Sequence, residues 1–404
     1  MLPLSDSDDA AFAAARPSFP SLQGRACMVT HSFGPCPAAM FDDLDDYRDS
    51  LRRRPHQLGA WFERLEEMYG LVERLLGAPP GSVALRESTS GCHASMLAAL
   101  EAPASGTAGR RRIVASALQF PSIGYMVAAQ ARRGFTIDVV DAPDGHLDAH
   151  RLAAHLDDDV ACITAPVVAS NRGALLDVRP LLEAANAAGA IAILDATAAV
   201  GLVPLDLSAL PPCVLVGGTV KWLGGGGTGL AFLHIHPALL DRLPVAYPGW
   251  LGDARFTAFA PDFVPAPGAR RHQQGTPAIE PVYTARAGIR FVLEQGVARL
   301  FARNQRLLAR LHARAMEHGL PLHSPRDPLR RAGTLALEID DAPAMVAALA
   351  ADGIDVDARG ARILRIGPHA CVTLDECDRT IDRVAAALEQ RNCAHSDRTA
   401  TAAR

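Results

Sequence analysis

An aspartate and a lysine stand at the ends of two neighbouring apolar segments of the sequence. Asp195 ends the run 190–195, and Lys221 lies a few residues beyond the run 213–217. If both runs are parallel strands, their carboxyl ends meet at one sheet edge, where open α/β sheets bind ligands. No acidic residue close in the sequence could pair with Lys221. Glycines at 217–218, 224–227 and 229 let a ligand or another backbone approach it closely.

This pair of side chains suits the cofactor pyridoxal 5'-phosphate (PLP). A lysine amine can hold PLP as a Schiff base, and a carboxylate keeps the pyridine nitrogen protonated so that the ring withdraws electrons. An exposed lysine beside a flexible glycine loop is the alternative explanation of the same residues. The local pattern therefore supports a PLP site and leaves this alternative open.

Two other motifs of the region lack the structural context that their chemistry needs. Gly224, Gly226 and Gly229 match the spacing of the dinucleotide fingerprint, but a strand-like run follows them where the fingerprint requires a helix. His234 and His236 would share one face of a strand, yet no third metal ligand is evident. We therefore expect neither a dinucleotide site nor a metal site.

The elements that would position these residues alternate between strand-like and helical segments. Strand-like runs lie at 112–118, 135–140, 159–168, 190–195, 213–217 and 229–235, and Ala-rich helical stretches lie at 121–133, 148–156 and 179–189. This alternation predicts an α/β fold, with a mostly parallel sheet sandwiched by helices. After a long helix at 282–317, the segment 333–391 reads β-α-β-α, which predicts a small α+β C-terminal domain.

The length of 404 residues fits two domains. We predict that residues 1–56 form an N-terminal arm joining the small domain, and that 57–281 form the large PLP-binding domain. Residues 282–391 then contain the long helix and the small C-terminal domain, and the polar tail 392–404 is expected to be disordered. The Pro- and Gly-containing stretch 241–281 should form a long ordered loop over a site.

Composition and charge narrow the expected partners and location. The chain is 49% hydrophobic and 21% charged, as in globular proteins, and its net charge of −4 argues against a nucleic-acid partner. No apolar run reaches about 18 residues, so we expect no membrane segment. The N-terminus shows no signal-peptide pattern, and the eight cysteines contain no C-x-x-C spacing, which favours reduced thiols in a cytoplasmic protein.

The segments Asp195–Gly201 and Val216–Leu223 with the following glycines resemble the fold-type I PLP enzymes of the class V aminotransferase group, and further matches follow in order over roughly residues 28–391. The resemblance implies that Lys221 and Asp195 are the catalytic pair and that Phe120 stacks on the cofactor ring. It implies that the cofactor phosphate is held by Ser88, Thr89, Thr219, Trp250 and Thr276. Ser88 and Thr89 would do so at a helix N-terminus, which attracts anions.

The same resemblance extends to the substrate and the assembly. Thr276 would reach the phosphate from the partner subunit, so the active unit should be a homodimer. Thr197 is a candidate for contact with the phenolic oxygen of the cofactor. Arg365 is expected to bind the carboxylate of an amino-acid substrate through its planar guanidinium, and His31 and Ser32 are expected to approach the substrate from the arm.

Within this group, the motifs are most similar to those of kynureninase-like proteins. The similar segments are His31–Gly34, Gly249–Gly252 and Asp357-x-Arg359. Three positions that are polar in kynureninases are Ile123, Ala198 and Val220 here, and their loss should change the rate or the reaction. The resemblance implies a PLP-dependent enzyme acting on an amino acid, with kynureninase-like hydrolytic C–C cleavage as the first choice.

Other reactions on the same scaffold stay open at this point. They are those of an aminotransferase or a C–S lyase, and a catalytically degenerate PLP-fold binding protein is a further alternative. A cysteine desulfurase is disfavoured, because its reactive cysteine would precede Arg365 and the segment 340–364 contains no cysteine. We expect Cys371, which follows Arg365, to be an inert core residue.

Overall fold

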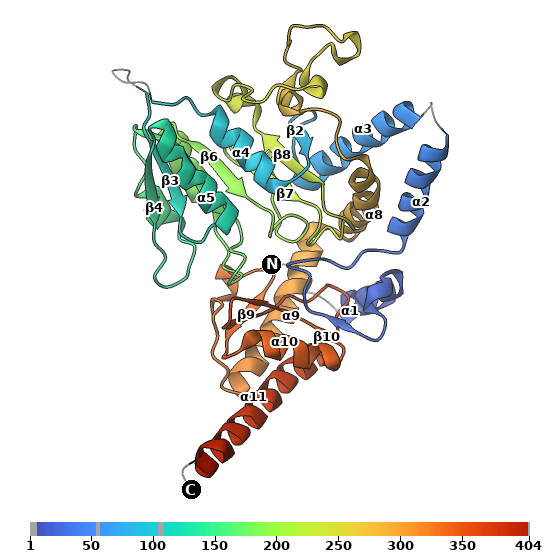
Figure 1. The fold of residues 1–404 in the computed structure, drawn as a ribbon, viewed down its shortest axis with the longest axis vertical. Coiled ribbons are helices and arrows are strands. Elements are labelled where there is room, and N and C mark those ends of the chain that lie inside the picture. Colours follow the sequence, from blue (N-terminus) through green and yellow to red (C-terminus); the bar gives the residue numbers. More distant parts are fainter. Residues whose placement is uncertain (1–5, 54–56, 104–108, 403–404) are drawn as a thin grey trace.

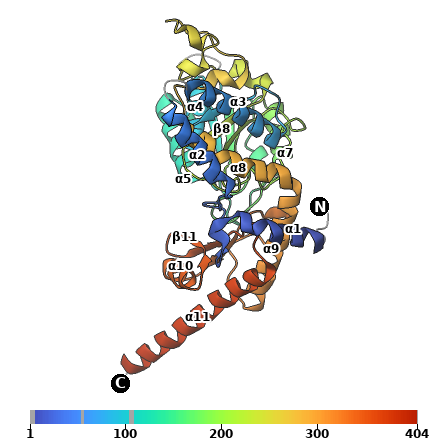
Figure 2. The ribbon, with the colours of Figure 1, turned by 90° about the vertical axis from the view of Figure 1, so that its right-hand side faces the viewer.

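The computed structural model of the chain describes residues 6–53, 57–103 and 109–402. A large α/β part and a smaller α+β part lie one above the other, and the N-terminal segment runs between them (Figure 1). Figure 2 shows the last helix extending away from the body of the molecule. No helix in the described ranges is long and apolar enough to cross a membrane.

A seven-stranded sheet with the order β2-β8-β7-β6-β5-β3-β4 forms the centre of the large part. Its parallel strands are β3 (Arg112–Ser116), β4 (Thr136–Val140), β5 (Val160–Pro166), β6 (Ile191–Asp195) and β7 (Val214–Gly218). Antiparallel pairing adds β8 (Ala231–Ile235) and β2 (Val83–Arg86) at one edge. The predicted mostly parallel sheet is confirmed, although the sequence pattern indicated neither β2 nor the direction of β8.

Alternate residues of each strand build two separate cores on opposite faces of this sheet. Ile191 and Ile193 of β6 pack on the face covered by α4 (Thr89–Ala99) and α5 (Pro121–Ala129). Ala192 and Leu194 pack on the other face, which is covered by α3 (Gln57–Leu76), α7 (Val178–Ala187) and α8 (Ile279–Gln295). The short helix α6 (Ala149–Ala153) lies beside α7. Because both faces are covered, strands β5 to β8 are buried along their whole length.

The smaller part contains a three-stranded antiparallel sheet with the order β11-β12-β9. These strands are β11 (Asp357–Arg359), β12 (Ile363–Ile366) and β9 (Leu335–Glu338), and they share a core with α9 (Val297–Glu317), α10 (Ala342–Ala351) and α11 (Leu374–Ala402). Strand β1 (Ala26–Cys27) pairs in parallel with β10 (Ile354–Asp355), which ties the N-terminal segment to this part. The exact domain limits stay a prediction.

Two features differ from the sequence-based expectations, and a third, the structure of the arm, had not been predicted. The long helix expected over 282–317 is two helices, since Gly296 adopts a φ of 79° between α8 and α9. The tail expected to be disordered from residue 392 continues α11 as far as Ala402. The N-terminal arm is largely helical, with α1 (Asp6–Ala15) and α2 (Ala39–Arg52).

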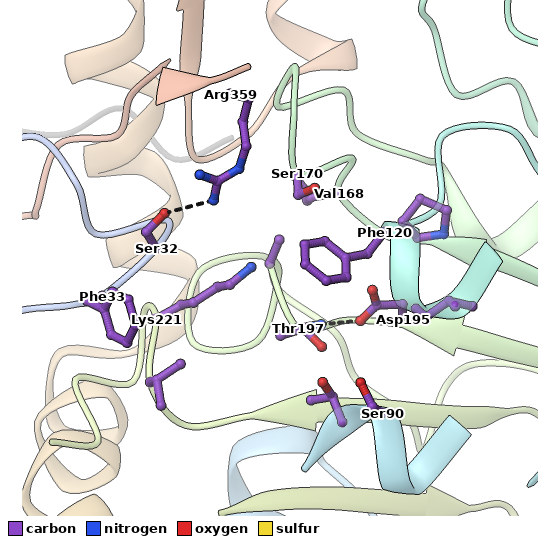
Figure 3. Close-up of a pocket in the computed structure, with 15 residues that line it drawn as sticks. Ser32, Phe33, Ser90, Phe120, Val168, Ser170, Asp195, Thr197, Lys221 and Arg359 are labelled. Atoms are coloured by element: carbon purple, nitrogen blue, oxygen red, sulfur yellow. Dashed lines mark hydrogen bonds between the residues drawn. The ribbon is translucent and has the colours of Figure 1, made fainter. Parts of the chain in front are cut away.

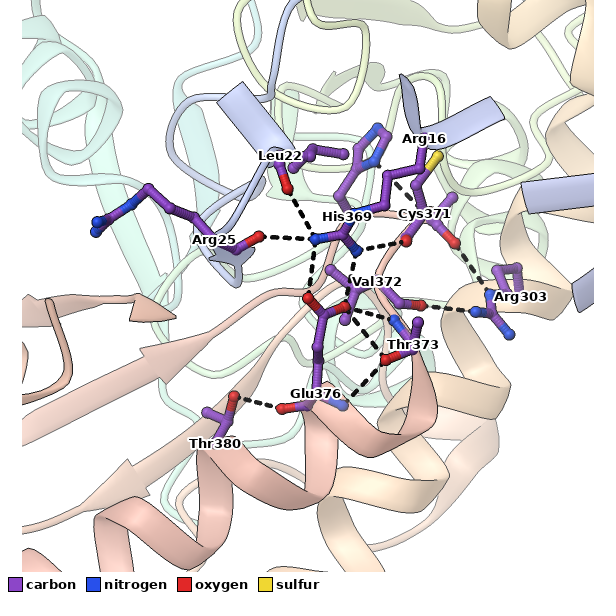
Figure 4. A network of polar contacts seen from close by, with 11 residues as sticks. Arg16, Leu22, Arg25, Arg303, His369, Cys371, Val372, Thr373, Glu376 and Thr380 are labelled. Atoms are coloured by element: carbon purple, nitrogen blue, oxygen red, sulfur yellow. Dashed lines mark hydrogen bonds and ion pairs between the residues drawn. The ribbon is translucent and has the colours of Figure 1, made fainter. Parts of the chain in front are cut away.

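Arg16 fastens the arm to the turn that follows β12 (Figure 4). Its guanidinium forms two 2.8 Å hydrogen bonds with Glu376 and also donates to three backbone carbonyl oxygens, those of Leu22, Arg25 and Cys371. From the other side, Arg303 of α9 donates to the carbonyl oxygens of Ala370 and Val372. These bonds fix the arm relative to the small sheet.

The arm reaches the lysine-bearing loop at Gly34. The Gly34 N–H donates to the Val220 carbonyl oxygen at 2.9 Å, and a Cβ atom at residue 34 would lie 2.0 Å from the Lys221 carbonyl oxygen. A side chain at this position would therefore collide with the backbone of the loop. The preceding residues, Ser32 and Phe33, are thereby held beside Lys221.

We expect Gly34→Ala to lower the free energy of unfolding by about 1–3 kcal/mol, because the added methyl group forces two backbones apart. Gly70→Ala is the matched control, since a Cβ atom at residue 70 has nothing within 4 Å. In the middle of α3, this control should be neutral or stabilising by up to about 1 kcal/mol. Urea unfolding measures both variants, and equal stability of the two would show that the contact imposes no constraint.

Candidate active site

A cavity of about 260 Å³ lies at the carboxyl ends of the parallel strands, facing the arm and the small sheet (Figure 3). Pro166 and Asp195, the last residues of β5 and β6, line it together with Lys221, three residues beyond β7. Ser32 and Phe33 line it from the arm, and Arg359 lines it from β11. The structure thus places Asp195 and Lys221 in one cavity closed by the smaller part of the molecule.

The side-chain amine of Lys221 makes no hydrogen bond or ion pair with any residue that the structure describes, and only its backbone carbonyl oxygen accepts a hydrogen bond, from the Gly224 N–H at 3.0 Å. Burial lowers the pKa of its ammonium group; the Asp195 carboxylate opposes this shift, and the charges of Arg365 and Arg359 add to it. More of the amine is therefore neutral and nucleophilic at a given pH than in an exposed lysine. Lys221 is also the single lysine among the 40 basic residues of the sequence. This count alone could have singled it out.

The polar groups beside Asp195 fit the ring of PLP. Asp195 Oδ1 accepts the backbone N–H of Thr197 at 2.9 Å, and its other carboxylate oxygen has no hydrogen-bond partner within the described ranges. Thr197 Oγ1 is buried and also lacks a partner, although Thr197 lines the cavity. A free carboxylate oxygen suits a protonated ring nitrogen, and an unpartnered buried hydroxyl suits a ring oxygen.

The N-terminus of α4 reaches the cavity and is the part of it best suited to an anion. Ser88 caps this helix, and its Oγ accepts the Gly91 N–H at 3.0 Å. Thr89 and Ser90 line the cavity at the first turn, where unpaired N–H groups and the helix dipole attract a phosphate. Ser88 itself is exposed and used as the cap, so Ser90, which sequence reasoning missed, lies where Ser88 was expected.

The remaining walls of the cavity are mainly apolar. Phe120, predicted to stack on the cofactor ring, lines the cavity where α5 begins. Ile123, Ala198 and Val220, the three apolar replacements noted in the sequence, all line it as well. At the three positions that are polar in the kynureninase pattern, the wall of this cavity is therefore apolar.

Six predicted site residues do not line this cavity: Ser88, His31, Thr219, Trp250, Thr276 and Arg365. The Thr219 hydroxyl donates to the Leu230 carbonyl oxygen at 3.1 Å. Trp250 lines a separate hollow and stacks on Phe259 with ring centroids 5.5 Å apart. Thr276 is exposed, four residues beyond η7 (Gly268–His272). The segment 241–281 is thus ordered around a hollow of its own.

His31 and Arg365 lie behind the cavity wall, around the carboxylate of Asp357. His31 Nε2 lies 2.9 Å from Asp357 Oδ1, and Ser32 donates its hydroxyl to Oδ2. Burial lowers the pKa of His31 to about 4, so its imidazole is neutral at pH 7. Burial raises the pKa of Asp357, but hydrogen bonds from His31 and Arg365 outweigh this effect and hold it well below its usual range. Asp357 is therefore ionised and only accepts.

Cys371 has no access to the cavity. It is 1% exposed and packs in a small core with Phe19, Leu22 and Cys27. Burial raises the pKa of its thiol to about 12, so it is not a reactive thiolate at neutral pH.

Comparison with known proteins agrees with this geometry. The family model "Aminotransferase class-V" matches residues 36–373. An "uncharacterized aminotransferase YcbU" of Bacillus subtilis is 28% identical over 92% of this chain and 96% of its own length. A kynureninase of Pseudomonas fluorescens is 28% identical over 80% of this chain and 78% of its own length.

The fold is also found in solved structures. The apo structure of a cysteine desulfurase from Thermococcus onnurineus NA1 superposes with a TM-score of 0.82 at 18% identity, covering 93% of this chain and 98% of that one. This similarity concerns the fold alone. Together with the family match over most of the sequence, it shows that the chain belongs to the class-V aminotransferase family of fold-type I enzymes, whose cofactor is pyridoxal 5'-phosphate.

Proposed function

We propose that this PLP-dependent enzyme acts on an amino acid. The proposed reaction is a kynureninase-like hydrolysis, which breaks a carbon–carbon bond in the substrate. The observation that carries the proposal is the cavity in which Lys221, of lowered pKa and without an ion pair, shares space with Asp195. Similarity to kynureninases over about four fifths of the sequence supports the choice of reaction.

PLP, when bound, withdraws electrons from the bonds around the α-carbon of the substrate. Lys221 would hold the cofactor, and its Nζ is the atom that would accept or return a proton. Asp195 presents its free carboxylate oxygen to the ring nitrogen, while the Thr197 N–H keeps its orientation. Phe120, which lines the cavity, would cover one face of the ring. The first turn of α4, with Thr89 and Ser90 and capped by Ser88, holds the phosphate.

The proposed active unit is a homodimer. The Leu251 N–H donates to the Gln274 carbonyl oxygen at 2.9 Å, and a Cβ atom at Gly249 would lie 2.4 Å from the Gln274 backbone. The segments that carry Trp250 and Thr276 are therefore in direct backbone contact, and neither residue lines the cavity of its own subunit. Both residues are proposed to reach the phosphate in the partner's cavity.

Transamination is the second candidate reaction. Ile123, Ala198 and Val220 leave apolar walls where kynureninases carry polar groups, which disfavours the activation of a water molecule. Transfer of an amino group between bound substrate and cofactor places a smaller demand on such groups. The similarity to a protein named as an aminotransferase, over 92% of the sequence, is consistent with this reaction.

Attachment of PLP to Lys221 is directly measurable, because no other lysine competes for it. We expect purified protein to take up one PLP per subunit, and borohydride to fix it to the peptide that contains Lys221. Lys221→Ala should abolish this covalent fixation and all turnover, whereas Lys221→Arg should keep the charge but also lose both. Mass spectrometry locates the label; a label elsewhere, or activity of Lys221→Ala, would refute the assignment.

The choice of reaction is tested by adding L-kynurenine to the PLP-loaded protein. Hydrolytic cleavage releases anthranilate, which is followed by its fluorescence, and Lys221→Ala is the inactive control. Conversion of bound PLP to pyridoxamine phosphate without anthranilate would favour transamination instead. If no amino acid in a broad panel changes the cofactor spectrum, the proposed enzymatic function fails and a degenerate binding protein is left.

A further inference from the structure

A second cavity, of about 840 Å³, lies between the large and the small part of the molecule and shares no lining residue with the first. The large part contributes the turn 144–146, which follows β4, and Arg172, which lies beyond β5. The small part contributes residues 322–327 and 330, which precede β9, and Glu338 of β9 itself. Most of these side chains are charged or polar, in contrast to the apolar walls around Lys221.

Three arginines of this second cavity have unpaired guanidinium groups. Arg172, Arg326 and Arg330 form no side-chain hydrogen bond or ion pair with any residue in the ranges 6–53, 57–103 and 109–402. The Nε atom of Arg172 is fully buried and has no partner, and the same is true of His146 Nδ1 in the same cavity. Because buried polar atoms without a partner are rare and costly, these two nitrogens mark places where a ligand atom would be expected.

The turn at Gly145 determines where the guanidinium of Arg172 lies. A Cβ atom at residue 145 would lie 1.9 Å from Arg172 Nη1, and Gly145 has a φ of 71°. Glycine therefore allows the guanidinium to lie directly against this turn. From the small part, Ser324 Oγ donates to the Arg172 carbonyl oxygen at 2.5 Å. Both parts of the molecule thus position this arginine.

The acidic residues of the second cavity are engaged elsewhere. Asp144 pairs with Arg151 at 3.4 Å and Glu338 pairs with Arg362 at 3.3 Å, and neither of these arginines lines the cavity. The third carboxylate, that of Asp327, caps η8 (Pro328–Arg330) by accepting a backbone N–H at 2.9 Å. The three lining guanidinium groups are therefore the unpaired charges, and they favour an anion.

The segment that follows β5 connects the two cavities. Val168 and Ser170 line the first cavity, and Arg172 lines the second. The same segment is bonded to the small part, since the Leu175 N–H donates to the Arg330 carbonyl oxygen at 2.9 Å. A ligand that contacts Arg172 and Arg330 together would therefore tie the large part to the small part.

We infer that the second cavity is a binding site for a small multivalent oxyanion, either a polycarboxylate or a phosphate compound, held by Arg172, Arg326 and Arg330. Guanidinium groups bind carboxylate and phosphate oxygens in the same bidentate geometry. Three such groups suit a ligand with more than one negative charge. Because the ligand bridges both parts, its binding also stabilises the folded chain. The inference is independent of the reaction at Lys221, since the two cavities share no residue.

Calorimetry tests the site on protein incubated with excess PLP, which occupies the first cavity. Citrate and pyrophosphate are titrated separately at constant ionic strength. We expect at least one of them to bind with a Kd of about 1 mM or lower and to raise the temperature of unfolding, without changing the cofactor absorption. Binding of citrate alone identifies a polycarboxylate site, and binding of pyrophosphate alone identifies a phosphate site.

The double variant R326Q/R330Q should weaken binding at least about 10-fold, because it removes two charged hydrogen-bond donors. Its matched control is R111Q/R132Q, which removes the same charge from two other exposed arginines. Arg111 and Arg132 precede the parallel strands β3 and β4, whereas the turn 144–146 follows β4, so these arginines lie at the opposite end of the sheet. The control should bind within about 2-fold of wild type, because salt screens distant exposed charges.

The variant G145A tests the geometry without changing any charge. Its methyl group would displace the guanidinium of Arg172 and should weaken binding about 5-fold, as for loss of one hydrogen bond. Gly319→Ala is the matched control, because Gly319 also has a positive φ, of 64°, and a Cβ atom there has nothing within 4 Å. This control should bind the anion as wild type does.

Absence of binding by both probes at concentrations up to about 10 mM would overturn the inference, and so would wild-type affinity of R326Q/R330Q. Equal weakening in R111Q/R132Q would also contradict it, because the effect would then be one of net charge. A change of the cofactor absorption that persists in R326Q/R330Q would assign the anion to the first cavity instead. Arg326 and Arg330 are exposed, so this variant is expected to fold, and thermal unfolding without ligand verifies it.

Discussion

The site depends on the enclosure of a lysine amine that has no ion-pair partner among the described residues. Desolvating a charged amine is costly, and the pKa of Lys221 falls as a result. The backbone around it is held by close contacts that only glycine permits. A Cβ atom at Gly224 would lie 2.6 Å from the Pro35 carbonyl oxygen, and one at Gly288 would lie 1.8 Å from the Leu223 carbonyl oxygen. The glycines thus fit the lysine loop between the arm and α8.

Asp357 contacts two arginines of the β11–β12 hairpin unequally. It binds Arg365 closely within the wall and leaves Arg359 only loosely held at the cavity. This difference requires the arm, since His31 and Ser32 occupy the rest of the carboxylate, and it requires the hairpin register that sets Asp357 opposite Arg365. The clamp of Arg16 on the turn after β12 keeps these two elements together. The contacts that fix the arm therefore also determine which arginine pairs closely with Asp357.

Much of the large part of the fold could be predicted from the sequence, because the periodicity of the apolar residues and the order of the strand-like and helical segments indicate it. The parallel strands, the helices between them and the meeting of Asp195 with Lys221 follow from apolar runs and from the rule that parallel strands end at one edge. The sequence pattern does not indicate which of the two arginines reaches the cavity. Arg365 and Arg359 are the same residue type six positions apart, and only strand pairing shows that Asp357 faces the former. Ser88 and Ser90 likewise differ only in which of them becomes the helix cap. The break at Gly296 depends on a positive φ that a helical pattern does not reveal.

The apolar walls limit which groups can move protons in the proposed reactions. Among the described residues that line the cavity, the hydroxyls of Ser32, Thr89, Ser90, Ser170 and Thr197 are too weakly acidic, and a guanidinium such as that of Arg359 only donates hydrogen bonds. Asp195 is directed to the ring nitrogen in the proposed complex. Lys221, whose pKa is lowered by burial, is then the one described lining residue suited to accept and return a proton. With Ile123, Ala198 and Val220 in place of polar residues, proton transfers would take place on the side of Lys221, and a step that needs a second base would depend on solvent or on the partner subunit.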